Sequence, residues 1–95
     1  MLVQHKKNNG KGFFYIGEED NRLAEITYTM PSPVKMIIDH TEVSDERRGK
    51  NAGYELVAAV VEYARANSIK IIPLCPFADS VFKKKTEFHD VLSQT

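Results

Sequence analysis

The chain has 95 residues, 42% of them hydrophobic, and its 13 basic and 13 acidic residues give a formal net charge of zero. This length predicts one domain over residues 1–95, and the balanced charge argues against a nucleic-acid binder that uses a broad basic surface. Cys75 is the single cysteine, so no internal disulfide can form and a disulfide-stapled extracellular scaffold is excluded. No apolar run is long enough to span a membrane, and the first residues lack the apolar core of a signal peptide, so we expect a soluble, cytoplasmic protein.

The first half of the chain predicts three strands. The aromatic segment 13–16 is typical of a strand, and the turn-forming residues 17–21 predict a hairpin leading to a second strand at 23–30. Two prolines in the segment 31–33 end that strand, because proline cannot donate a hydrogen bond to a ladder. Residues 34–43 are rich in β-branched side chains and predict a third strand. We expect the three strands to form an antiparallel meander.

The second half of the chain changes to a helical period. Apolar residues recur on one helix face from 56 to 64, which predicts a buried helix that ends at residues 67–68. An isoleucine-rich strand follows at 69–75, and its Pro73 favours a sheet edge or a strand end. Short helical segments are expected at 79–84 and 87–92.

This order of elements predicts an α/β (α+β) fold. A strand, a helix and a second strand within about forty residues make a βαβ unit, whose right-handed crossover places the two strands parallel. The expected architecture is therefore a mixed sheet, with an antiparallel N-terminal part and one parallel pair.

The loop that enters the long helix contains the strongest local signal. Arg47, Arg48 and Lys50 surround the point where the helix begins. A helix N-terminus carries free N–H groups and a partial positive charge, so basic residues there are unfavourable unless an anion binds. Two interpretations remain at this point: a phosphate site, or a helix entry with solvated basic side chains.

Glycines and an asparagine support the phosphate interpretation. Gly49 and Gly53 let the backbone approach a ligand closely, and Asn51 suits a helix cap or a left-handed turn. The segment 48–53, Arg-Gly-Lys-Asn-Ala-Gly, resembles the pyrophosphate-binding motif of the GNAT superfamily of N-acetyltransferases. That motif is Gln or Arg, two residues, Gly, one residue, then Gly or Ala. Arg48 and Gly53 match its ends, and Asn51 stands where the motif has glycine.

The resemblance extends over about residues 13–92 to a minimal single-domain branch of acetyltransferase-like proteins. The segments that carry it are 23–28, 38–43, the basic loop and 71–78. It implies a GNAT-like sheet whose parallel strands splay apart, with acetyl-CoA (coenzyme A) in the gap and its acetyl group between His40 and Cys75. The residues implied to contact acetyl-CoA are Thr41, Glu42, Val43, Arg47, Arg48, Gly49, Lys50, Asn51, Ala52 and Gly53.

A second basic run could add contacts to the same cofactor. Lys83 and Lys84 could reach the phosphates or adenosine of CoA, with Phe77 or Phe82 against the base. The alternative is that these lysines are only solvated. No pair of histidines or acids has metal-ligand spacing, so we expect no metal site.

Two residues are candidates for catalysis. Cys75 could accept the acetyl group as a nucleophile, or it could be a small buried hydrophobe that lines the pocket. His40 could act as a general base, or it could be a packed, hydrogen-bonded histidine. Strand alternation places His40 on the face of Met36 and Ile38 and Asp39 on the opposite face, so a Cys-His-Asp triad is not supported.

The resemblance implies an acetyl-CoA-dependent N-acetyltransferase that acts on an unidentified amine, either directly or through Cys75. The alternative is a non-catalytic CoA- or acyl-CoA-binding module. Small size favours this alternative, because larger GNAT enzymes use an additional helical region for substrate recognition. A third hypothesis for the function is an anion-binding fold unrelated to CoA.

Overall fold

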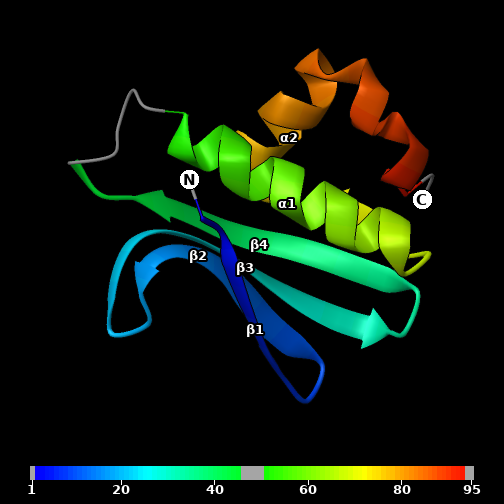
Figure 1. The fold of residues 1–95 in the computed structure, drawn as a ribbon. Coiled ribbons are helices and arrows are strands. Elements are labelled where there is room, and N and C mark those ends of the chain that lie inside the picture. The colour runs from blue at the N-terminus through cyan, green and yellow to red at the C-terminus, as the bar shows by residue number, and fades with distance from the viewer. Residues whose placement is uncertain (1, 46–50, 94–95) are drawn as a thin grey trace.

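The structure is a computed structural model that describes residues 2–45 and 51–93. Five strands form one sheet in the order β1-β2-β3-β4-β5, with antiparallel pairs from β1 to β4 and a parallel pair between β4 and β5 (Figure 1). The elements along the chain are β1 (Gln4–Asn8), β2 (Lys11–Glu18), β3 (Asn21–Ser32), β4 (Lys35–Val43), α1 (Ala52–Ala66), β5 (Lys70–Pro73), α2 (Pro76–Lys84) and the 3-10 helix η2 (Thr86–Val91). The predicted mixed sheet with a βαβ unit is confirmed.

The predicted three-strand meander is incomplete, because β1 adds a fourth antiparallel strand. The sequence of β1 contains no apolar residue, so the hydrophobic pattern gives no strand signal there. Its inward side chain, His5, replaces an apolar contact: the ring stacks on Phe14 at 3.9 Å, and Nε2 lies 2.6 Å from the Tyr28 hydroxyl. Burial, followed by the charge of Lys7, lowers the pKa of His5, and burial raises the pKa of Tyr28 to about 12.

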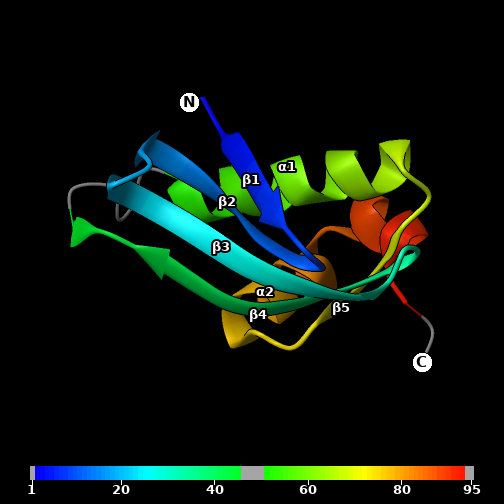
Figure 2. The same ribbon diagram turned by 90° about the horizontal axis from the view of Figure 1, so that it is seen from below.

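The core lies between the sheet and helix α1. The helix presents the apolar face that its periodicity predicts, and its buried side chains include Leu56, Val57, Val60, Val61 and Ala64. They pack against alternate side chains of β2, β3 and β4. The described helices all lie on this inner face, which leaves the outer face of the sheet without a helix (Figures 1 and 2).

Helix α2 begins at Pro76, three residues before the predicted start at 79. Proline is favoured in the first turn of a helix, where its missing N–H is not needed. Pro76 therefore stops the preceding extended segment and is also the first residue of α2. Downstream, the Arg65 guanidinium bonds the Asp90 carboxylate at 2.7 and 2.8 Å, which ties η2 to α1. Ser93 then donates to the carbonyl of Ile71 at 2.8 Å beside β5.

None of the helices within residues 2–45 and 51–93 is long and apolar enough to cross a membrane.

Candidate functional site

The parallel strands β4 and β5 separate halfway along β4. Their pairing runs from Lys35↔Lys70 to Ile38↔Pro73. The amides of Leu74 and Cys75 then both donate to the Ile38 carbonyl, at 3.0 and 3.2 Å, and the chain turns away into α2. Strand β4 continues to Val43, so its last five residues have no pairing to β5. This is the divergence that the family resemblance implies.

A β-bulge in β4 lies at the point of separation. Thr27 of β3 pairs with His40, but the next residue, Tyr28, pairs with Ile38, which leaves Asp39 as the extra residue. A bulge shifts the alternation of side chains along the strand that contains it. Ile38 is fully buried on the inner face, and beyond the bulge Thr41 takes the inner position, paired with the buried Ile26.

The bulge overturns the predicted position of His40. His40 pairs with Thr27 on the outer face, its side chain is 61% exposed, and its Nε2 lies 3.5 Å from Glu42 Oε1. It does not share the face of Ile38, and Asp39 lies with it on the outer face, where it accepts a hydrogen bond from the Thr27 hydroxyl. The predicted face of His40 is therefore wrong, because the prediction assumed uninterrupted alternation, whereas Asp39 does lie on the predicted face, opposite Ile38.

Cys75 lies on the other side of the sheet from His40. It is 6% exposed and belongs to the core, and it occupies the N-cap position of α2. Its thiol donates a hydrogen bond to the Thr41 hydroxyl across 3.2 Å. The family resemblance implies a contact of Thr41 with acetyl-CoA, but the contact of its side chain with Cys75 depends on the bulge, which the sequence does not show.

Beyond the bulge, β4 pairs with β3 on one side only. The backbone groups on its other side face the space from which β5 has turned away. The Ser44 amide donates to Leu23 of β3 at 2.8 Å. Backbone groups of successive strand residues point to alternate sides, so those of Val43 and Thr41 point away from β3. Glu42 directs its backbone to β3 and its exposed side chain to the outer face.

Helix α1 begins beside this edge with an unusual cap. Asn51 adopts a left-handed conformation, with φ 61° and ψ 20°, and its side chain makes no capping hydrogen bond. Its carbonyl accepts the Glu55 amide at 2.9 Å, so it is the N-cap through its backbone. The prediction that Asn51 is a cap or left-handed turn residue is confirmed. Arg47, Arg48, Gly49 and Lys50 lie outside the described residues.

Phe77 of α2 covers the first turn of α1. A Cβ atom placed on Gly53 would lie 2.5 Å from the Cζ atom of the Phe77 ring, so the close approach requires glycine. Ala52 and Gly53 are buried, whereas Phe77 remains 41% exposed. The structure therefore brings together Phe77 and the end of the predicted phosphate motif.

Of the other three predicted contacts on α2, the one for Phe82 is wrong, and Lys83 and Lys84 are exposed. Phe82 is 1% exposed and packs edge-on against Phe88, so it is a core residue and cannot stack on an adenine base. Lys83 pairs with Asp79 at 3.0 Å, and Lys84 is exposed at the end of the helix. Among the described residues, no group of three His, Cys, Asp or Glu side chains could hold a metal ion.

Comparisons with known proteins agree with this geometry. The model of the GCN5-related N-acetyltransferase family matches residues 13–91. A GCN5-like protein from Staphylococcus aureus, solved in solution, is 44% identical, with a TM-score of 0.75 over 97% of this chain and 89% of that one. The chain therefore belongs to the GCN5-related N-acetyltransferase family.

More distant structures share the fold. A ribosomal-protein-alanine N-acetyltransferase from Brucella melitensis is 14% identical, with a TM-score of 0.67 over 93% of this chain and 65% of that one. An IAA acetyltransferase from Bacillus cereus is 15% identical, with a TM-score of 0.60 over 78% of this chain and 53% of that one. The chain thus spans less than two thirds of the length of either enzyme. A comparison with curated proteins finds no similar sequence.

Proposed function

We propose that the protein transfers an acetyl group from acetyl-CoA to an amine. The observation that carries this proposal is the separation of β4 from β5 at the bulge, next to the start of α1, in a chain of the N-acetyltransferase family. The separation turns backbone groups of Thr41 and Val43 toward the space that β5 leaves, where an extended ligand arm can pair with them. Acetyl-CoA has such an arm, and it supplies the acetyl group as a thioester that a nitrogen nucleophile can attack.

The residues at the start of α1 fit the pyrophosphate of CoA. Asn51 provides the left-handed turn that a glycine would otherwise provide, and its side chain leaves the first-turn amides uncapped. Arg47, Arg48, Gly49 and Lys50 complete this proposed contact on the strength of the motif. Phe77 and Lys84 lie on α2 as further candidate contacts.

In direct transfer, the acceptor nitrogen forms a bond to the acetyl carbon while the bond from that carbon to the CoA sulfur breaks. CoA leaves as the thiolate, and the proton of the amine passes to Nε2 of His40. Because His40 lies on the outer face, it serves an amine that approaches from that face. In transfer through Cys75, the acetyl group first forms a thioester with Sγ, and the thiol proton goes to the departing CoA sulfur. The amine then attacks the acetyl carbon, the bond from that carbon to Sγ breaks, and the amine proton returns to Sγ.

The single cysteine is consistent with a protein that functions in the reducing cytoplasm. We infer this location from that property of the sequence and from the family assignment.

The experiment that tests the function measures acetyl-CoA binding by calorimetry and CoA release with a panel of amines. We expect binding and amine-dependent release, with release strongly reduced in His40→Gln. Cys75→Ala separates the two routes, because only the route through the thiol requires it. Binding without release for any amine would identify a non-catalytic CoA-binding module, and no binding at millimolar acetyl-CoA would refute the proposal.

A further inference from the structure

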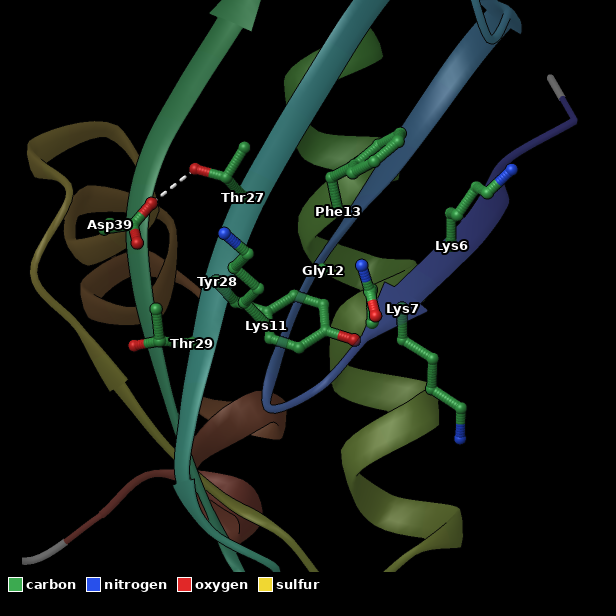
Figure 3. Close-up of a pocket in the computed structure, with 10 residues that line it drawn as sticks. Lys6, Lys7, Lys11, Gly12, Phe13, Thr27, Tyr28, Thr29 and Asp39 are labelled. Atoms are coloured by element: carbon green, nitrogen blue, oxygen red, sulfur yellow. Dashed lines mark hydrogen bonds between the residues drawn. The ribbon is translucent and has the colours of Figure 1, made fainter.

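The outer face of the sheet contains a groove of about 330 Å³ (Figure 3). This volume is at the small end of the range for ligand pockets. The cross-strand pairs Lys6↔Phe13, Phe13↔Thr27 and Lys11↔Thr29 place the principal side chains of the groove on one face. The residues that line the groove include Lys6, Lys11, Phe13, Thr27, Thr29 and Asp39.

The two ends of the groove carry opposite charges. Within the described residues, the ammonium of Lys11 has no ion-pair partner, while Lys6 is already paired with Glu19 at 2.9 Å. At the other end, one oxygen of Asp39 accepts the Thr27 hydroxyl, and the second oxygen is left for another donor. Lys11 therefore offers a cation and Asp39 offers an anion to the same bound molecule.

An apolar surface lies beside these charges, on β2. The ring of Phe13 forms part of the wall, and the guanidinium of Arg22 covers this ring at 3.8 Å, which holds it in place. The Cα atoms of Lys11 and Asp39 are two strands and two residues apart, roughly 12 Å. Figure 3 shows the Lys11 side chain extending toward the end that contains Thr27 and Asp39. The Lys11 ammonium therefore lies nearer to Asp39 than the Cα atoms do, and a short molecule that carries both charges close together matches this arrangement.

The anionic end of the groove is adjacent to the separation of β4 and β5. Asp39 is the bulge residue, and it follows Ile38, whose carbonyl accepts the Cys75 amide. His40 is next to Asp39 on the same outer face. An ammonium group held at Asp39 would therefore lie beside the proposed base and at the apex of the acetyl site, and it loses one proton to solvent before the neutral amine attacks.

We propose that this groove binds the acceptor, and that the acceptor is a small amine that also carries a carboxylate. Its ammonium group pairs with Asp39, its carboxylate pairs with Lys11, and its carbon chain packs on Phe13. This inference rests on the proposed function for the role of the ligand as acceptor. Binding of an amino carboxylate in the groove can be measured without acetyl-CoA.

The test uses pairs of amines that differ only in the carboxylate: 4-aminobutyrate with propylamine, and phenylalanine with phenethylamine. Each is titrated into the full chain and followed by NMR. We expect the carboxylated member to bind about tenfold more tightly, the factor of a charge-assisted hydrogen bond, with shifts at residues 11, 13, 27 and 39. Lys11→Gln should abolish this preference. Asp39→Asn should weaken both members of each pair.

The matched control is Lys35→Gln, which removes a lysine from the start of β4 outside the groove. It should leave both affinities unchanged. Equal affinity within each pair, or an undiminished preference in Lys11→Gln, would overturn the groove proposal even if acetyl transfer occurs. The KM for the acceptor in the transfer assay should follow the same pattern. Groove binding combined with no CoA release would refute the acceptor role and the proposed function, but not the ligand class.

Discussion

The thiol of Cys75 and the hydroxyl of Thr41 are joined by a hydrogen bond of 3.2 Å that crosses from the start of α2 to β4. The contact exists because the bulge at Asp39 turns Thr41 inward and His40 outward. One extra residue thus divides the proposed site into two sides. Thr41 and Cys75 lie on the inner side, and Asp39 and His40 lie on the outer face, where Asp39 lines the groove.

Replacing Thr41 by valine tests the role of this hydrogen bond. Valine preserves the shape of the side chain but removes the acceptor for the thiol. On the route through Cys75, acetylation of the thiol by acetyl-CoA should slow three- to tenfold, the effect of a hydrogen bond worth about 1 kcal/mol. Intact-protein mass spectrometry without an amine measures this rate. Thr41→Ser should retain it, and a rate unchanged in Thr41→Val would show that the hydroxyl has no such role.

Asn51 is predicted to be required for its backbone conformation. Asn51→Ala should destabilise the fold by about 1 kcal/mol, because alanine adopts a positive φ less readily. Asn51→Gly should keep the fold and bind acetyl-CoA at least as tightly as the natural chain. Asn9, with φ 49° in the β1–β2 turn, provides the matched control.

Asn9→Ala should cost a similar free energy of unfolding without changing the affinity for acetyl-CoA. Chemical denaturation and calorimetry together measure both quantities. Weaker acetyl-CoA binding in Asn51→Gly than in the natural chain would mean that the asparagine side chain itself contributes to the site.

The contact between Gly53 and Phe77 can be measured by a double-mutant cycle. Alanine at 53 improves helix propensity by up to about 1 kcal/mol, but its methyl group collides with the exposed phenyl ring. In the Phe77→Ala background the collision is absent, so Gly53→Ala should be more favourable there by about 1 kcal/mol. Urea denaturation of the four proteins gives this coupling. A coupling of zero would contradict the observed packing.

His5 should make stability depend on pH. Its pKa is lowered in the folded state from an ordinary value of 6.5, so the unfolded chain takes up the proton more readily. Stability from this source is complete above about pH 6.5 and falls as the pH decreases below it. The groups that face His5 are Lys7, Tyr28 and Tyr63, of which only Lys7 is charged in this range.

Denaturation of His5→Gln and of the natural chain at about pH 7.5 and about pH 5 tests this linkage. The natural chain should lose more stability between these two conditions than His5→Gln. An equal loss would show that other groups account for the acid sensitivity.

The sequence predicted the elements whose signal is local. The apolar period of α1 located the helix, and the motif around Asn51 identified the left-handed residue at its start. Strand β1 was missed because its inward contact uses an imidazole ring instead of an apolar side chain. Phe82 was misassigned because a sequence does not distinguish a core aromatic residue from an exposed one such as Phe77.

The bulge was beyond prediction for a different reason. The residues Ile38-Asp39-His40 contain no mark of an irregularity, since register depends on how β4 pairs with β3. A single extra residue reversed the faces of all side chains after it. For this reason the geometry of the proposed catalytic residues, which lie on both faces of the sheet, could not be derived from alternation.

The central claim is that acetyl-CoA binds where β4 leaves β5 and α1 begins. An NMR titration of the full chain with acetyl-CoA tests this directly. We predict large backbone shifts at Thr41, Val43, Asn51 and Gly53 and at Phe77, with none at Lys11 on the outer groove. Shifts concentrated on the outer face, or no shifts at millimolar acetyl-CoA, would contradict it.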